Sequence, residues 1–110
     1  MESITEKTND EHALAIAIDD ETLVLLAGLF KMLSDPTRLK ILNALALHEQ
    51  SVGDISRRMH MSLPAISYHL KYLRILRLIR SRRNGKGVFY SVNKRIVYYL
   101  FNIGLDCVKG

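Results

Sequence analysis

Side chains that can bind phosphate groups are concentrated in the second half of the chain. From Ile55 to Leu105 there is no Asp or Glu. The same stretch contains eleven basic residues: Arg57, Arg58, Lys71, Arg74, Arg77, Arg80, Arg82, Arg83, Lys86, Lys94 and Arg95. An acid-free run of this length creates a positive field, and its usual partner is a nucleic-acid backbone. The alternative reading of these charges is a basic face that only meets solvent.

A second group of residues has the chemistry needed to read bases. It mixes small, polar and aromatic side chains within one short stretch. Ser67 and His69 can exchange hydrogen bonds with bases or phosphates, and Leu63 and Ala65 can contact a thymine methyl group. The residues expected to bind DNA in this stretch are Ser62, Leu63, Pro64, Ala65, Ser67, Tyr68, His69 and Lys71. Further on, Arg82, Arg83, Asn84 and Lys86 are expected to contact phosphates or the minor groove.

Catalytic patterns do not occur in the sequence. It has no Gly-x-Ser-x-Gly, no Walker loop, no paired carboxylates in an apolar setting and no His-x-x-x-His. The acid-free stretch also argues against acid–base catalysis there. The chain is therefore expected not to be an enzyme.

The elements that must position these residues are mostly helices. An apolar stretch predicts a helix over residues 21–33, and Asp35 and Pro36 then suit the cap and first position of the next helix. Ser51 and Asp54 form a capping-box pattern for a short helix to about residue 59. Ser62 caps a longer helix, expected to end near residue 76, and Pro64 lies in its first turn.

A change of period after residue 78 predicts a β-hairpin. Residues 79–83 and 88–92 are the two strand candidates, and the sequence Asn-Gly-Lys-Gly between them is typical of a hairpin turn. Asn93 is then placed to cap a final helix over residues 94–108. The predicted fold is mainly α with a small β-hairpin wing. This is a winged helix-turn-helix, with the helix-turn-helix at about 51–78 and the wing at about 79–92.

The first and last helices are too apolar for one buried stripe. Such helices need cover on more than one side, and a second chain is the simplest cover in so small a domain. A homodimer that packs through these two helices is expected. The predicted interface residues are Leu23, Leu26, Phe30, Leu100, Ile103 and Cys107.

Three segments resemble the ArsR/SmtB family of transcriptional repressors: FKMLSDPTRLKIL at 30–42, MSLPAISYHLKYL at 61–73 and RRNGKGVFYSV at 82–92. The resemblance covers about residues 21–110. It implies a dimeric, sequence-specific repressor that binds double-stranded operator DNA and that an inducer, often a metal ion, releases in many members. Arg38, in the first segment, joins the expected DNA-binding residues. A non-specific architectural nucleic-acid-binding protein is the alternative function.

The positions at which the resemblance would place metal ligands are mostly filled by other residue types. Ser51 and Gly53 stand where many members have a cysteine pair, and Lys94, Ile96, Cys107 and Gly110 stand where others bind zinc. Only Cys107 has a ligating side chain, and a plain core residue is the favoured reading of it. His12 and Cys107 are the remaining candidate ligands for a transition-metal effector such as zinc. His60, where members usually have glycine, is interpreted as a turn residue.

Charge also divides the chain into two parts. Residues 1–21 contain seven acidic residues and one basic residue, Lys7. An acidic N-terminal arm is therefore expected over residues 1–20 and one domain over 21–110. No apolar stretch is long enough for a membrane span, and the N-terminus lacks the pattern of a signal peptide. A cytoplasmic location without membrane contact is expected.

Overall fold

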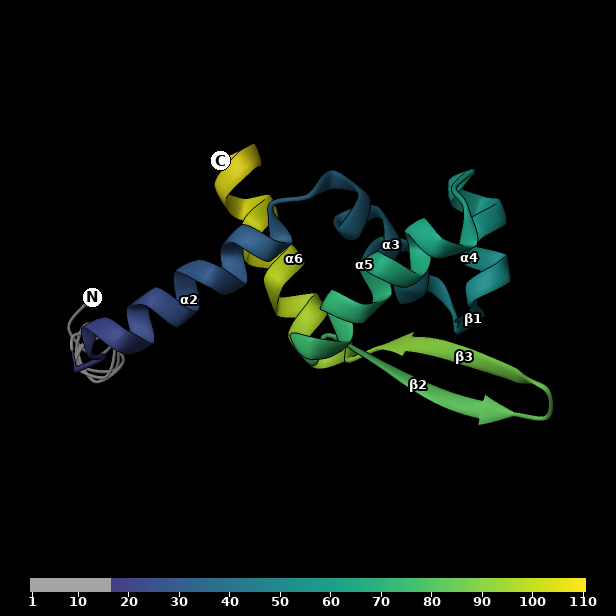
Figure 1. Ribbon diagram of the computed structural model, residues 1–110. Coiled ribbons are helices and arrows are strands. Elements are labelled where there is room, and N and C mark those ends of the chain that lie inside the picture. The colour runs from purple at the N-terminus through teal and green to yellow at the C-terminus, as the bar shows by residue number, and fades with distance from the viewer. Residues whose placement is uncertain (1–16) are drawn as a thin grey trace. The chain divides into compact units, whose positions relative to one another are not determined.

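The computed structural model describes residues 17–110 and divides at Lys31–Met32 into two compact units. The N-terminal unit contains most of helix α2, Asp20–Leu33. The second unit, Met32–Gly110, contains the remaining elements, coloured from blue to yellow in Figure 1. Candidate ligand His12 and most of the predicted acidic arm lie outside the described residues. Among the helices at 17–110, none is long and apolar enough to span a membrane.

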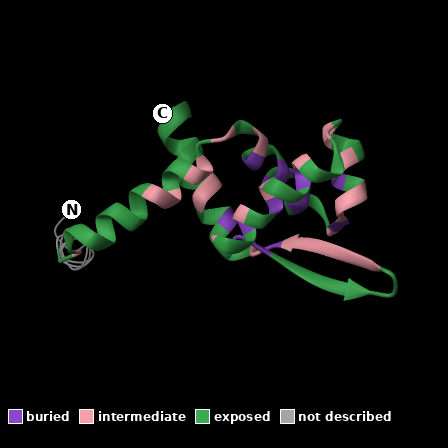
Figure 2. Ribbon diagram, viewed as in Figure 1, coloured by how far each residue is buried: buried purple, intermediate pink, exposed green. Residues whose placement is uncertain are grey.

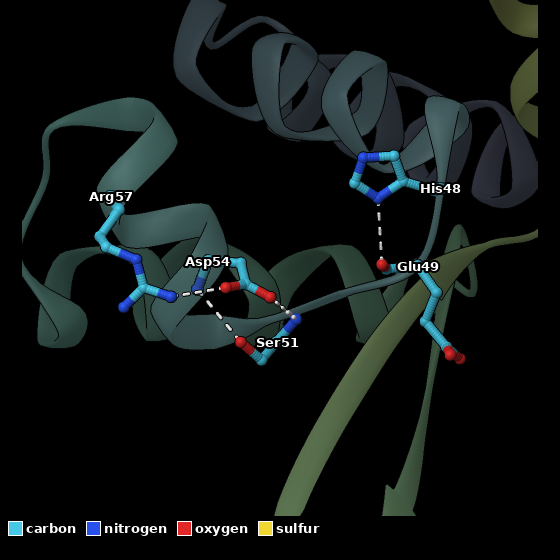
Figure 3. Close-up of polar contacts among 5 residues, drawn as sticks. All are labelled: His48, Glu49, Ser51, Asp54 and Arg57. Carbon is cyan, nitrogen blue, oxygen red and sulfur yellow. Dashed lines mark hydrogen bonds and ion pairs between the residues drawn. The ribbon is translucent and has the colours of Figure 1, made fainter.

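Helices α3, α4 and α5 form the centre of the second unit. They span Pro36–Leu47, Val52–Met59 and Leu63–Ile75. Their starts follow the predicted capping chemistry. The Asp35 Oδ1 atom accepts a hydrogen bond from the Thr37 N–H at 2.8 Å, and Pro36 stands in the first turn of α3. The Ser51 and Asp54 side chains form the expected capping box at α4, which Figure 3 shows.

Three short strands complete the unit. Strands β2 (Ile79–Asn84) and β3 (Gly87–Val92) form the predicted hairpin, and its turn contains only Gly85 and Lys86. Gly85 has a φ of 62°, which a side chain would disfavour. Strand β1 (Gln50–Ser51), which the sequence pattern did not indicate, pairs with the other side of β3. Figure 1 shows the hairpin extending away from the helices.

Apolar residues from every layer of this unit form one core. Figure 2 shows the buried positions gathered on α3, α4 and α5 and at the base of the hairpin. Their burial is the main favourable contribution to folding and orients each helix about its axis. The buried hydrophobic residues of the cluster are Ile41, Leu42, Leu45, Ile55, Ile66, Leu70, Leu73, Leu78, Ile79, Val92 and Val97.

Helix α6 (Lys94–Lys109) is the last element in the sequence, and the predicted capping of its start by the Asn93 side chain was wrong. Asn93 stands at the cap position, but its side chain makes no capping hydrogen bond. The backbone begins the helix instead, since the Val97 N–H donates to the Asn93 carbonyl at 3.0 Å. Buried Val97 anchors this first turn to the core.

Candidate nucleic-acid interface

Helix α5 presents an exposed face opposite its buried one. Ser62 accepts a hydrogen bond from the Ala65 N–H at 3.2 Å and so begins the helix as predicted. Ile66, Leu70 and Leu73 are buried at helical spacing. Most positions on the opposite face are exposed, and Leu63 and Tyr68, for example, are 50% and 54% exposed. The predicted DNA-binding residues exposed on this helix and its cap are Ser62, Leu63, Pro64, Ser67, Tyr68 and Lys71.

The turn before α5 depends on a left-handed residue. His60 has φ 55° and ψ 44°, as its interpretation as a turn residue requires. The Met61 N–H donates to the Ser56 carbonyl at 3.1 Å, and the His60 N–H to the Arg57 carbonyl at 3.4 Å. These two bonds form a Schellman motif, which turns the chain sharply at the end of α4. The turn sets where α5 begins.

A second left-handed residue follows α5 and was missed by the sequence analysis. Arg77 has a φ of 61°. The Leu78 N–H donates to the Leu73 carbonyl at 3.0 Å, and the Arg77 N–H to the Arg74 carbonyl at 2.9 Å. This is again a Schellman motif. Glycine at this position would have signalled it, whereas arginine carries no such signal.

Arg38 and His69 are less exposed than most of the other predicted DNA-binding residues. Arg38 is only 8% exposed, and His69 is half-buried. The Arg38 Nε atom donates to His69 Nδ1 at 3.1 Å, and Arg38 Nη1 donates to the Met32 carbonyl at 3.0 Å. Ala65 is also half-buried. The exposed ridge of α5 is thus narrower than the residue set predicted from the sequence.

The hairpin carries the predicted basic side chains on exposed positions. Arg82, Arg83 and Lys86 are all exposed. Arg82, however, makes a bidentate ion pair with Glu49, in which Nε lies 2.7 Å from Glu49 Oε2 and Nη2 lies 2.6 Å from Glu49 Oε1. The hydrogen bond from Arg82 lowers the pKa of the Glu49 carboxyl and, reciprocally, raises the pKa of Arg82. Part of the wing's charge is therefore neutralised within the chain.

Most of the remaining basic side chains have no such partner. Within residues 17–110 the ion pairs are Arg82–Glu49 and Arg57–Asp54. The other nine basic residues of the acid-free run make no ion pair with any described residue: Arg58, Lys71, Arg74, Arg77, Arg80, Arg83, Lys86, Lys94 and Arg95. These charges are available to a polyanion.

The residues present do not fit a metal site at the positions that the family resemblance indicates. Ser51 uses its hydroxyl in the capping box, and Gly53 has no side chain. His48, which Figure 3 also labels, makes a ring hydrogen bond with the Glu49 carbonyl at 3.2 Å. Among the described residues, no three His, Cys, Asp or Glu side chains lie close enough together to hold a metal.

Within residues 17–110, most apolar side chains of α2 and of the second half of α6 are exposed. Helix α2 has no buried residue, and Leu23, Leu26 and Phe30 are all exposed. On α6, Ile103 is 63% exposed and Leu100 is half-buried. Cys107 is a free and exposed thiol, so its favoured reading as a core residue was wrong for the single chain. The reason is that α6 packs only its first half against the core.

The comparisons with known proteins agree with this geometry. Residues 35–81 match the family described as "Bacterial regulatory protein, arsR family". The chain is 36% identical over 83 residues to the HTH-type transcriptional regulator KmtR of Mycobacterium tuberculosis, covering 76% of this chain and 64% of that protein. It is 39% identical over 82 residues to the transcriptional repressor SdpR of Bacillus subtilis, covering 74% of this chain and 91% of the repressor.

A solved structure supports the fold and the class of protein. The homodimeric winged helix-turn-helix DNA-binding domain Mb0332 from Mycobacterium bovis superimposes with a TM-score of 0.71 and 29% identity. The match covers 84% of this chain and 89% of that domain. The predicted winged helix-turn-helix is therefore confirmed. The relatives are transcriptional regulators, which also confirms the expectation that the chain is not an enzyme.

Proposed function

Because the chain belongs to the ArsR family of bacterial regulatory proteins, we propose that it is a homodimeric repressor that binds operator DNA through α5 and the β2–β3 wing. The observation that carries this proposal is the exposed ridge of α5. Its exposed side chains near the N-terminus of the helix are small, polar, aromatic or, at Leu63, aliphatic, and those farther along include the basic Lys71 and Arg74. That arrangement suits base contacts at the start of a recognition helix and phosphate contacts around it.

The wing supplies the sequence-independent part of this binding. Arg83 and Lys86 are exposed near the hairpin turn and make no ion pair with a described residue. Each phosphate that such a side chain neutralises steepens the salt dependence of binding by a slope of about 0.9. Arg82 contributes less than its neighbours because Glu49 already holds its guanidinium.

The dimer in this proposal is formed by the uncovered apolar faces. Leu23, Leu26 and Phe30 on α2, with Leu100, Ile103 and Cys107 on α6, are the proposed interface residues. Support comes from the exposure of all of these residues except half-buried Leu100 in one chain, and from the homodimeric state named for the similar Mb0332 domain. Exposed apolar surface of this extent is typical of a protein–protein contact. A two-fold dimer would present two copies of α5 to successive major grooves.

We further propose that a small effector releases the repressor from DNA. The family resemblance implies a small effector, often a metal ion. Ser51, Gly53, Lys94 and Ile96 cannot supply soft ligands, so we infer that zinc has no effect through those positions. Zinc titration of operator affinity in the wild type and in the Cys107→Ser variant tests this inference. If zinc changes the operator affinity of both proteins equally, residues other than Cys107 bind the zinc.

The decisive experiment compares operator DNA with random duplex. The operator is obtained by selection from a randomised duplex library, and affinities are measured between 50 and 300 mM salt. We expect a specificity ratio of at least about 1,000 for the wild type. Ser67→Ala should reduce that ratio, whereas Arg83→Ala should weaken binding to both duplexes and flatten the salt slope. A wild-type ratio near one would instead support the architectural alternative.

The dimer has its own test. Ile103→Glu should lower the sedimentation mass from dimer to monomer and weaken operator binding, because an operator with two half-sites needs two copies of α5. Lys109→Glu, at an exposed position in the last turn of the same helix, is the matched charge control and should remain dimeric. A monomeric wild type would overturn the proposed interface.

A further inference from the structure

Arg38 is a buried arginine in the second unit, and its surroundings are specific. It extends from α3 towards α5, and its side chain donates hydrogen bonds to His69 Nδ1 and to the Met32 carbonyl. The Met32 bond satisfies a carbonyl in the last turn of α2, where helical partners are absent. A guanidinium removed from water needs such partners. The side chain is therefore held by at least two directed contacts.

The contact with His69 determines where that imidazole carries its proton. Because Nδ1 accepts from Arg38 Nε at 3.1 Å, the ring proton must lie on Nε2. The two ring nitrogens are directed to different sides, so Nε2–H is a donor that Arg38 does not use. His69 would then offer DNA one donor and no acceptor, which suits the N7 and O6 atoms of guanine or a phosphate.

The same guanidinium also faces two aromatic rings of α5. It lies 4.7 Å from the ring centroid of Tyr72 and 5.8 Å from that of Tyr68. Tyr68 and Tyr72 contact each other edge to face at 5.0 Å. Cation–π contacts of this kind favour one arrangement of the rings. Tyr68 is exposed on the ridge of α5 that is proposed to read DNA. Arg38 therefore contacts two neighbouring residues of that ridge, Tyr68 and His69.

A direct phosphate contact is the competing role for Arg38. No carboxylate among residues 17–110 pairs with it, and an arginine without a counter-ion suits a phosphate. Against this role, Nε and Nη1 are already engaged and the residue is 8% exposed. Only the remaining hydrogens on Nη1 and Nη2 are left for a phosphate, on a side chain that is almost closed to solvent.

We infer that Arg38 is a positioning residue for sequence reading: it holds His69 as the Nε2–H tautomer and orients Tyr68, rather than binding DNA itself. This inference rests on the proposed function, in which α5 reads the operator. Under this inference, buried Arg38 affects which DNA sequence the protein prefers. It does not affect the part of the binding that depends on charge.

The test uses the full chain and the operator selected with the wild type. Arg38→Lys keeps the positive charge that a phosphate contact needs but lacks the planar donor fork. Long-range ¹H–¹⁵N NMR of the free protein reports the His69 tautomer. Affinities for operator and random duplex are measured over a range of salt concentrations for Arg38→Lys, His69→Ala and the double variant. A thermal melt checks that each variant is folded.

The inference predicts a wild-type His69 in the Nε2–H form and a mixed tautomer in Arg38→Lys. Operator affinity should fall about 2- to 13-fold, the range that a lost hydrogen bond gives. Random-duplex affinity and the salt slope should stay unchanged. In the His69→Ala background, Arg38→Lys should have a smaller effect on operator affinity than in the wild type, because its main route of action is gone.

Other results would overturn it. A wild-type His69 protonated on Nδ1 would do so without any variant, even if Arg38→Lys fails to fold. Equal weakening of both duplexes by Arg38→Gln, with a salt slope reduced by about 0.9 and a tolerated Arg38→Lys, would show a phosphate ligand instead. A wild type without operator preference would refute the proposed function, whereas the tautomer would still decide the Arg38–His69 contact.

Discussion

Replacing His60 by glycine should stabilise the protein, although it removes a whole side chain. His60 holds a left-handed backbone with φ 55° and ψ 44° at the end of α4. Its imidazole is exposed and makes no hydrogen bond with a described residue, so little packing is lost. A left-handed conformation costs a residue with a Cβ atom about 1–2 kcal/mol, and glycine avoids that cost.

The magnitude follows from two opposing terms. Glycine makes the unfolded chain more flexible, which costs about 0.4–1 kcal/mol. When this cost is subtracted from the relief of about 1–2 kcal/mol at the turn, the free energy of unfolding should rise by about 0.5–1 kcal/mol per protomer. For a unit of this size that corresponds to a rise in Tm of about 2–8 °C. The melts must be made at one protomer concentration, because dimer stability depends on it.

His60→Ala is the matched control for the glycine variant. Alanine also removes the imidazole but keeps the Cβ atom, so it should change stability by less than about 0.5 kcal/mol. The ratio of operator to random-duplex affinity should stay the same in both variants, because the turn keeps its geometry. If alanine stabilised as much as glycine, the imidazole and not the backbone would be the cause. A less stable glycine variant would refute the strain argument altogether.

Three further outcomes are expected. Arg77→Gly should also raise the Tm by a few degrees, because Arg77 has a φ of 61°, and Arg77→Ala serves as its control in the same melt. Glu49→Gln should strengthen random-duplex binding and steepen its salt slope in a fluorescence titration, because it releases the Arg82 guanidinium; an unchanged slope would mean that Arg82 does not reach DNA. The pKa values of Glu49 and Asp54 are lowered in the folded chain, mainly by the hydrogen bonds from Arg82 to Glu49 and from Ser51 to Asp54. The stability that these ionised carboxylates contribute is therefore fully present above their ordinary pKa values of 4.5 and 3.8. It is lost as the pH falls through the lowered pKa values of the folded chain. In denaturant titrations between pH 6 and 3, the double variant Glu49→Gln/Asp54→Asn should lose less stability than the wild type, and equal losses would contradict this.

The ion pair between Glu49 and Arg82 has a consequence for the wing. It joins the segment before β1 to β2, across 33 positions of sequence. Strand β1 pairs with β3 at Gln50–Tyr90 and Ser51–Phe89, so the segment that contains Glu49 and β1 holds the middle of the hairpin. The outer part, with Arg83 and Lys86, is held only by the β2–β3 ladder. The middle of the hairpin is therefore fixed to the rest of the unit, and its basic tip meets phosphates in the proposed complex.

Local chemistry made much of this protein readable from its sequence. Asp35, Ser51 and Ser62 cap helices because each has a short oxygen-bearing side chain just before an apolar helical pattern. The Gly85 turn lies between two strand-forming runs. These signals depend on residues within a few positions of one another, and so the order of the helices, the β2–β3 hairpin and the exposed ridge of α5 could be predicted, whereas β1 could not.

Long-range contacts were decided only by the tertiary structure. Nothing local shows that Arg38 meets His69, 31 positions away, or that Glu49 pairs with Arg82. Nor does Arg77 carry any mark of its left-handed backbone, since the Leu73–Leu78 cap imposes it. The sequence by itself determined the fold and its basic, DNA-facing character, because periodicity, capping and charge are properties of residue type. Which of those residues are free to reach DNA depends on the neighbours that folding brings to them.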